Sequence, residues 1–210
     1  MTTSSSSGKT QNPSLWTEAL ADAHAPSLAA DIEVDVAVVG GGITGVTAAM
    51  LLAQAGKRVA LLEMDRTGRG TTSSTTAHLT EAIDARYQNL EKDFGKEGAK
   101  LVAVASRVAL RELQHLVAFH HIDCDWRRLP GFLYSESERD LDLLHREYEA
   151  AKRTGLEVEM TRDVPLPFRA AAAVMFPNQA EFHVGKYLNA LVRRLRALHV
   201  PIFEGTRVTA

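Results

Sequence analysis

The chain has 210 residues, of which 45% are hydrophobic and 24% charged, and its formal net charge at pH 7 is -2. This composition is typical of a soluble globular protein with a substantial core, and it lacks the basic excess that favours nucleic-acid binding. A single cysteine, Cys124, excludes an internal disulfide framework and fits a reducing compartment, so we expect a cytoplasmic protein.

Residues 1–30 are predicted to form a tail and a strap. Residues 1–13 are polar and rich in Ser and Thr, without the basic and apolar regions of a secretory signal, and are expected to be disordered. From residue 14 to 31, Trp16, Leu20 and Leu28 stand among Ala, Pro and Asp. This pattern indicates a strap that lies on the following domain.

A glycine-rich sequence then lies between two apolar runs. Residues 34–39 predict a strand, Gly-Gly-Gly-Ile-Thr-Gly follows at positions 40–45, and residues 43–55 have the composition of a helix. Gly56 can end that helix in a left-handed conformation, and residues 58–62 predict a second strand. This order is typical of a Rossmann-like βαβ unit that binds a dinucleotide.

Each glycine of the motif has its own physical role in such a unit. Gly40 allows a tight turn, Gly42 allows backbone to approach a pyrophosphate, and Gly45 allows the helix to pack closely on the strand. The helix N-terminus offers N–H groups and partial positive charge to the diphosphate. Glu63, after the second strand, can accept hydrogen bonds from ribose hydroxyls and disfavours NADP. The candidate cofactor-binding residues here are Gly40, Gly42, Ile43, Thr44, Gly45 and Glu63.

Two other interpretations of this stretch are a membrane span and a different buried βα turn. Residues 36–56 contain no charged side chain and include Gly41-x-x-x-Gly45, a pattern of membrane-helix dimers. Three adjacent glycines would weaken a helix by about 1 kcal/mol each relative to alanine. The run also ends in Lys57-Arg58 and another strand. The dinucleotide site is therefore favoured, and no membrane association is expected.

The segment from Thr67 to His78 contains only small or polar residues except Arg69, and it predicts a loop. Such a loop is either a flexible surface connection or a second ligand segment, because hydroxyls and free N–H groups allow close approach to a flat polar cofactor. The candidate binding residues in it are Thr71, Thr72, Thr75, Thr76, Ala77 and His78.

The middle of the chain predicts a second, α+β region. Residues 97–119 have helical periodicity, and the apolar positions expected to pack are Leu101, Val104, Val108, Leu113, Leu116 and Val117. Further predicted elements are strands at 123–126 and 131–134 joined through Pro130, a helix from a capping box at Ser135 and Glu138 to Thr154, and strands at 157–160 and 172–176.

The last part of the chain returns to the pattern of a parallel α/β unit. Residues 186–199 predict a helix and residues 201–208 a strand. We place the domain boundaries at 1–30, 31–84, 85–180 and 181–210.

No metal-ligating or catalytic residue is assigned from the sequence. His120, His121 and Cys124 lack a second ligand pair at standard spacing, so no metal site is expected. No arrangement of nucleophile and base can be assigned from one sequence.

From about Ser14 onward the sequence resembles the FAD-dependent oxidoreductases of the D-amino-acid oxidase and glycine oxidase family. The resemblance is carried by residues 35–45, by Leu61-Leu62-Glu63, by Gly70-Thr71-Thr72, and by Phe182-His183 to Tyr187-Leu188 leading into residues 204–208. It is greatest to members with Ser-Leu-Trp near the start and Ile-Asp-Cys-Asp in the middle, several of which carry a C-terminal Rieske iron-sulfur domain.

The resemblance implies FAD as the cofactor. It implies that the glycine motif holds the diphosphate, that Glu63 holds the ribose, and that the segment from Thr71 to His78 passes beside the isoalloxazine ring. The backbone at Arg207 and Val208 would contact the adenine side. A histidine at position 78 could donate a hydrogen bond to the flavin, relay protons or carry a covalent link, or it could simply bond loop carbonyls.

The fold expected is therefore α/β: a Rossmann-like FAD-binding βαβ domain with an inserted α+β portion of a substrate domain, incomplete at the C-terminus. The expected activity is oxidation of an amine or amino-acid-like small molecule by hydride transfer to flavin N5, with a Rieske domain or other electron acceptor outside this chain. The resemblance makes the chain an N-terminal fragment. Alternatives are a non-catalytic dinucleotide-binding fragment and an NAD-dependent oxidoreductase.

Overall fold

The structure, a computed structural model, describes residues 14–20 and 24–209. These residues form two compact units. The first comprises the described residues up to Thr75 and from Val184 onward, and the second runs from Thr76 to His183. We had predicted the corresponding boundaries at 84/85 and 180/181. The predicted disordered tail at 1–13 lies outside the described residues.

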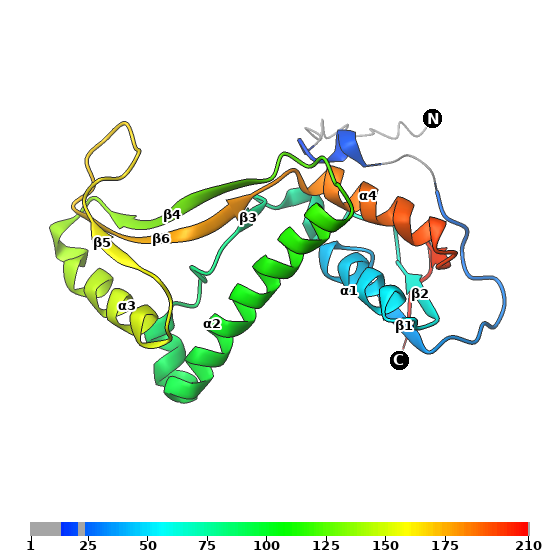
Figure 1. Ribbon diagram of the computed structural model, residues 1–210, viewed down its shortest axis with the longest axis horizontal. Coiled ribbons are helices and arrows are strands. Elements are labelled where there is room, and N and C mark those ends of the chain that lie inside the picture. Colours follow the sequence, from blue (N-terminus) through cyan, green and yellow to red (C-terminus); the bar gives the residue numbers. More distant parts are fainter. Residues whose placement is uncertain (1–13, 21–23, 210) are drawn as a thin grey trace, which may run out of the picture. The chain divides into compact units, whose positions relative to one another are not determined.

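The first unit is a parallel α/β unit (Figure 1). Its sheet has the order β1-β2-β7, and both pairings are parallel. The mixed helices and sheets confirm the predicted α/β class. The elements are β1 (Val36–Val39), α1 (Ile43–Gln54), β2 (Val59–Leu62), α4 (Val184–Ala197) and β7 (Ile202–Phe203), with short 3-10 helices η1 (Thr17–Ala19) and η2 (Thr71–Ser74).

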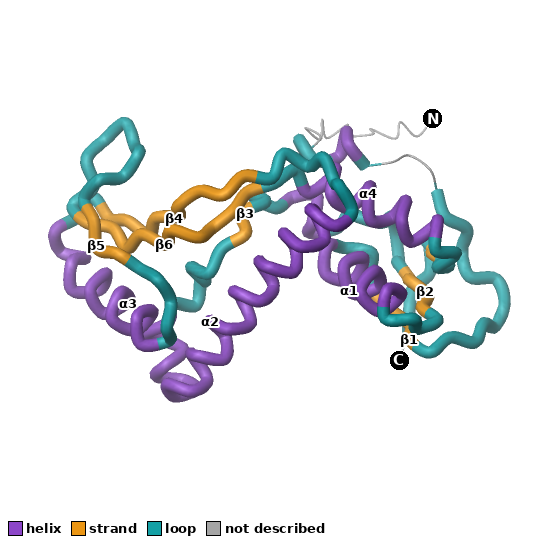
Figure 2. The backbone as a smooth tube through the Cα atoms, viewed as in Figure 1, coloured by secondary structure: helices purple, strands orange, loops and turns teal. Residues whose placement is uncertain are grey.

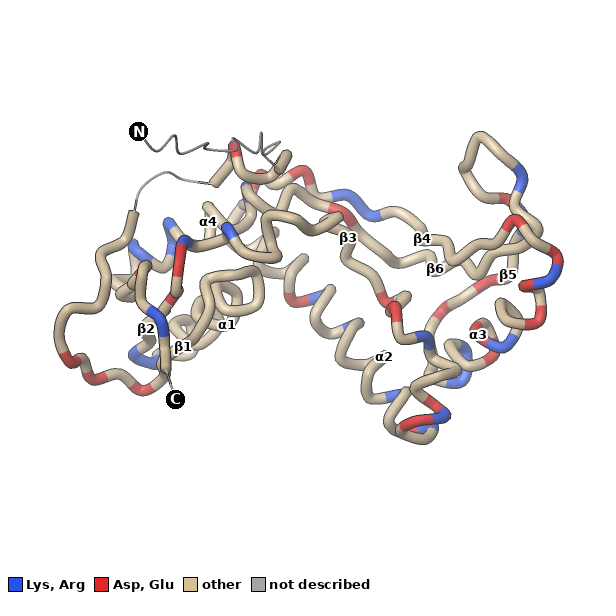
Figure 3. The backbone as a smooth tube through the Cα atoms, turned by 180° about the vertical axis from the view of Figure 1, so that it is seen from behind, with Lys and Arg blue, Asp and Glu red and all other residues tan. Residues whose placement is uncertain are grey.

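Helix α1 is apolar because it packs on its neighbours along most of its length. It carries no Lys, Arg, Asp or Glu (Figure 3), and Val46, Ala49 and Met50 are buried. It contacts α4, where the Thr47 and Tyr187 hydroxyls are 3.0 Å apart. Gly56, with φ +76°, follows the helix end as predicted. No helix among residues 14–20 and 24–209 is long and apolar enough to cross a membrane.

The described part of the N-terminal strap lies along the first unit. The Trp16 indole donates to the carbonyl of Thr75 at 2.7 Å. Further along, the amide of Leu28 donates to the Thr206 hydroxyl at 3.0 Å, and the amide of Glu204 donates to the carbonyl of Pro26 at 3.2 Å. The first bond joins the strap to the end of the loop after β2, and the other two join it to the segment that follows β7.

The second unit is an antiparallel sheet with two helices (Figure 2). Strand β6 pairs with β4 on one edge, and with β3 and β5 at opposite ends of its other edge. Helices α2 and α3 pack on each other, and α3 also packs on β6. The elements are β3 (His78–Leu79), α2 (Tyr87–Phe119), β4 (Arg127–Ser135), η3 (Glu138–Asp140), α3 (Leu141–Arg153), β5 (Glu159–Thr161) and β6 (Ala172–Glu181).

Helix α2 differs from its prediction in both length and buried face. It begins at Tyr87, ten residues before the predicted start at 97, and is interrupted at Gly95, where φ is +71°. Leu101 is 70% exposed, and Val104 and Val108 are also exposed, so the predicted packing of these three is wrong in the described chain. Its buried residues include the small Ala99 and Ala103 in the middle of the helix, and Leu110 and Leu116 further along, of which Leu116 is buried as expected.

Two local predictions around β4 are also wrong. Residues 123–126 are not a strand, since Asp125 has φ +54°, a left-handed conformation that interrupts a strand. Strand β4 instead runs through Pro130, where its register with β6 shifts because proline cannot donate to the ladder. The capping box at Ser135 does not form, because Ser137 caps η3 and the Ser135 hydroxyl bonds Asp140 at 2.6 Å.

Candidate functional site

The turn between β1 and α1 requires glycine at two positions. Gly40 has φ +102°, a conformation that residues with a side chain rarely adopt. A Cβ at Gly45 would lie 1.9 Å from the carbonyl oxygen of Gly40, so only glycine lets the helix approach the end of the strand. The amide of Gly40 donates to the carbonyl of Leu62 at 2.8 Å, which joins the turn to the end of β2.

Glu63 follows β2 and its carboxylate faces this turn. Oε2 accepts from the amide of Gly41 at 2.6 Å, and Oε1 accepts from the amide of Asp65 at 2.9 Å. Two backbone N–H groups therefore fix the side chain beside the glycine motif. A carboxylate offers about four acceptor sites, so further donors can still be accommodated.

The loop after β2 returns to the same place. The amide of Gly68 donates to the carbonyl of Gly41 at 2.9 Å. The Thr72 hydroxyl accepts from the amide of Ile43, the first residue of α1, at 3.1 Å. A Cβ at Gly42 would meet only this hydroxyl oxygen, at 3.0 Å. Thr72 is therefore the loop residue that lies against the start of α1.

The structure thus brings part of the predicted set together and leaves part of it elsewhere. Gly40, Gly42, Ile43, Gly45, Glu63 and Thr72 surround the turn. Thr44 and Thr71 are exposed nearby in sequence, and Thr75 bonds Trp16 through its carbonyl. Val208 is 51% exposed and lies beyond β7, since the predicted strand at 201–208 is reduced to Ile202–Phe203.

The remaining three candidates belong to the second unit. Thr76 is exposed, Ala77 is buried with φ +58°, and His78 is exposed on β3 opposite Glu181. His78 begins the sheet of that unit, and Thr76 and Ala77 directly precede it. Their proposed role beside the flavin stays a prediction.

Glu204, which was not among the candidates predicted from the sequence, holds the start of the loop. It is 7% exposed, and its carboxylate accepts from the amides of Thr67 at 2.8 Å and Ala25 at 3.0 Å. Burial raises the pKa of Glu204, but these hydrogen bonds favour the charged form more strongly, so the pKa lies below its ordinary value. A charged residue directly after a buried strand was the available signal.

No metal site was predicted from the sequence at His120, His121 and Cys124. Cys124 is buried, and its carbonyl accepts from the amide of His183 at 2.7 Å. In the described part of the chain, no group of three or more His, Cys, Asp or Glu side chains gathers as metal ligands.

A family model described as "FAD dependent oxidoreductase" (DAO) matches residues 35–210 of the chain. A Bacillus subtilis (strain 168) protein named as a Rieske 2Fe-2S iron-sulfur protein, YhfW, is 36% identical over 181 residues, which cover 86% of this chain and 36% of that protein. The gamma-glutamylputrescine oxidoreductase of Escherichia coli (strain K12) is 28% identical, covering 87% of this chain and 43% of that protein.

Among solved structures, the glycine oxidase of Geobacillus kaustophilus has a similar fold, with a TM-score of 0.66 and 21% identity. The match covers 83% of this chain and 47% of the glycine oxidase chain. This chain therefore spans less than half the length of each of these three proteins.

Proposed function

Because the chain belongs to the family of FAD-dependent oxidoreductases, we propose that it forms the FAD-binding region of an enzyme that oxidises an amine or an amino-acid-like small molecule. The diphosphate of FAD would lie at the glycine turn, and Glu63 would bind the ribose. The buried single cysteine agrees with a reducing compartment, and we place the protein in the cytoplasm.

One observation carries the proposal: Glu63, Thr72 and the turn at 40–45 meet where β1 and β2 end. The carboxyl ends of parallel strands are where nucleotides bind in doubly wound folds. Gly42 has no side chain to cover its backbone. A Cβ built at this position would contact only the Thr72 hydroxyl. These residues therefore fit a diphosphate that approaches the backbone closely.

Glu63 would bind the ribose without losing its present position. Its two hydrogen bonds from Gly41 and Asp65 orient the carboxylate, and the remaining lone pairs can accept from two adjacent hydroxyls. Thr72 can donate its hydroxyl proton to a phosphate oxygen, because in its bond with Ile43 it acts as the acceptor.

When bound, FAD supplies a ring that accepts a hydride at N5 from the carbon bearing the amine, so the substrate is oxidised by two electrons and the flavin reduced. Amine and amino-acid substrates are supported by the names of two similar proteins, gamma-glutamylputrescine oxidoreductase and glycine oxidase. The similarity to YhfW supports a Rieske-type iron-sulfur domain as electron acceptor.

The test is the visible absorbance of the purified chain, followed by heat release and chromatography of any bound nucleotide. The proposal predicts a yellow protein, or a colourless one that takes up added FAD, and the released nucleotide should be FAD. Binding of NAD in place of FAD would overturn the assignment, and so would failure of the folded chain to bind either nucleotide.

A further inference from the structure

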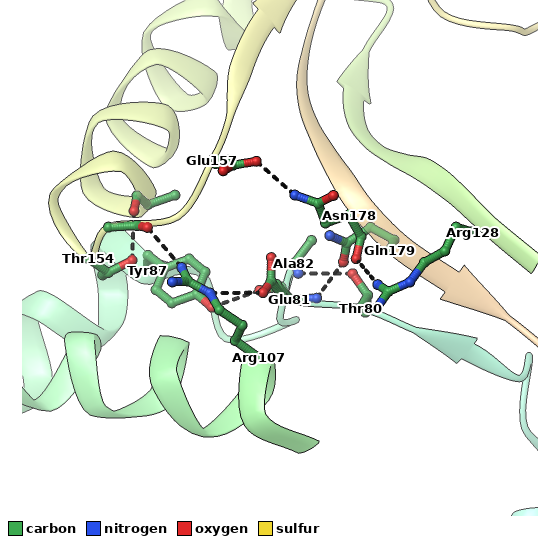
Figure 4. Close-up of polar contacts among 12 residues, drawn as sticks. Thr80, Glu81, Ala82, Tyr87, Arg107, Arg128, Thr154, Glu157, Asn178 and Gln179 are labelled. Carbon is green, nitrogen blue, oxygen red and sulfur yellow. Dashed lines mark hydrogen bonds and ion pairs between the residues drawn. The ribbon is translucent and has the colours of Figure 1, made fainter. Parts of the chain in front are cut away.

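The second unit contains a cavity that the proposed flavin site does not use. It has a volume of about 370 Å³ and lies between α2, the segment after β3, and the part of the sheet near β6. Figure 4 shows the polar side chains around it. Small-molecule sites have volumes of roughly 300–1,000 Å³, so this cavity can hold a small ligand. Its charged lining residues are Glu81, Arg107, Arg111, Arg128 and Glu157.

Both carboxylates of the lining already have partners within the wall. Glu81 is 6% exposed, and its Oε1 accepts from Arg107 Nε at 3.3 Å. Glu157 accepts from the side-chain amide of Asn178 at 2.8 Å. Arg107 also donates to the carbonyl of Gly155 at 2.8 Å. Each lining carboxylate therefore already has a hydrogen-bond donor in the wall.

Two guanidinium groups have no carboxylate partner. Arg128 donates to neutral oxygens, the Gln114 side chain at 3.1 Å and the Asn178 carbonyl at 2.6 Å. Arg111 makes no hydrogen bond or ion pair with any residue of the described chain. With three guanidinium groups and two carboxylates, the lining carries one more positive than negative charge. A guanidinium matches the planar geometry of a carboxylate, so these groups favour that ligand.

A buried side-chain amide lies next to the lining residue Glu81. Gln179 is 3% exposed, and its Oε1 accepts from the amide of Glu81. Its Nε2 is buried and has no acceptor among the described residues. Figure 4 shows this side-chain amide between Asn178 and Glu81. Gln179 does not line the cavity, but its side chain is bonded to the lining residue Glu81 and can therefore respond to a ligand bound there.

We propose that this cavity binds a small carboxylate, with Arg111 and Arg128 as its cationic contacts. Every residue of the site belongs to the second unit. The proposal therefore stands apart from FAD binding and can be tested without flavin.

Succinate is a suitable probe, and 1,4-diaminobutane is a matched control with the same number of carbon atoms but no carboxylate. The full chain, labelled with ¹⁵N and free of flavin, is titrated with each compound and followed by NMR. Succinate is expected to shift the backbone amide signals of Arg111 and Arg128, which line the cavity, in a saturable way, whereas the diamine should leave them in place.

Arg111→Gln tests the contact, and Arg162→Gln is its control, because Arg162 is an exposed arginine of the same unit outside the cavity. Arg111→Gln should weaken succinate binding about tenfold, which corresponds to about 1.4 kcal/mol. Arg128→Gln should also weaken it, and Arg162→Gln should not. Equal affinity of Arg111→Gln and wild type, equal responses to succinate and the diamine, or no saturable shift with succinate would each overturn the proposal.

Discussion

Each unit directs a glutamate at backbone N–H groups near the start of a helix, but the surroundings differ. In the second unit, Glu147 from α3 is 2% exposed and accepts from the amides of Tyr87 and Gln88, the first residues of α2. In the first unit, Glu63 is only partly buried and bonds the amide of Gly41, ahead of α1. The same kind of hydrogen bond can therefore serve stability in one unit and ligand binding in the other.

The residues around Glu147 in the second unit are also buried. Tyr87 is fully buried, and its hydroxyl donates to the carbonyl of Glu81 at 2.7 Å. Burial, helped by the nearby charges of Glu81 and Glu147, raises the pKa of Tyr87 to about 12. Around α1, by contrast, the N-cap residue Gly42 has no side chain to cap the helix. The comparison predicts ligand effects at the first helix and stability effects at the second.

The largest expected effect is loss of FAD binding in Gly42→Val. The new side chain would occupy the space proposed for the diphosphate, while the backbone at Gly42 has φ -78°, which any residue adopts. Only the movable Thr72 hydroxyl lies near the added Cβ, so the fold should survive. Flavin titration with circular dichroism as the folding control checks this, and normal FAD affinity would refute the role of Gly42.

Glu147→Ala should lower the free energy of unfolding by about 3 kcal/mol, because two amides at the start of α2 lose a charged acceptor in a buried place. Chemical denaturation measures the loss. Glu147→Gln keeps one acceptor oxygen and should lose less. A loss below about 0.5 kcal/mol in Glu147→Ala would contradict the stabilising role assigned to this carboxylate.

Glu63→Ala should weaken FAD binding by roughly 1–3 kcal/mol through loss of charged hydrogen bonds. Its effect on unfolding should be smaller than that of Glu147→Ala, because Glu63 is less buried. Calorimetric titration with FAD measures the change in binding free energy, and chemical denaturation of both variants measures the change in the free energy of unfolding. If Glu63→Ala affected stability alone, the two glutamates would have the same role and the comparison would fail.

The smallest expected effect is the contribution of Glu204 to stability and its loss at low pH. Its folded pKa lies below the ordinary value of 4.5, so its contribution is present above that value and is lost as the pH falls through the folded pKa. Wild type should exceed Glu204→Gln in stability by about 1 kcal/mol at pH 7, and the difference should vanish in acid. Unfolding curves of both proteins across pH 7 to 3 test this, and a pH-independent difference would contradict it.

The sequence predicted the glycine turn well because its requirements are local. Gly45 must be small and Gly56 must be left-handed, and both conditions follow from neighbours a few residues away. Glu63 was found because it directly follows a predicted strand. Thr72 was named as a candidate binding residue, but its contact with the start of α1 was not predicted, since the bond with Ile43 joins residues far apart in the sequence.

The second unit was predicted less well because its contacts are not local. The start of α2 at Tyr87 depends on Glu147, sixty residues later, and no pattern near Tyr87 signals it. Leu101 and Val108 have helical spacing, yet the alanines of α2 are buried in their place. Apolar periodicity identified the helix and the buried Leu116, but it did not predict that Leu101, Val104 and Val108 are exposed.

The most direct test of the central claim is a crystal structure of the chain with FAD. The account predicts the diphosphate at the turn between β1 and α1, beside Gly42 and Thr72, with the ribose hydroxyls on the Glu63 carboxylate. A diphosphate bound elsewhere, or a ribose that makes no contact with Glu63, would contradict it.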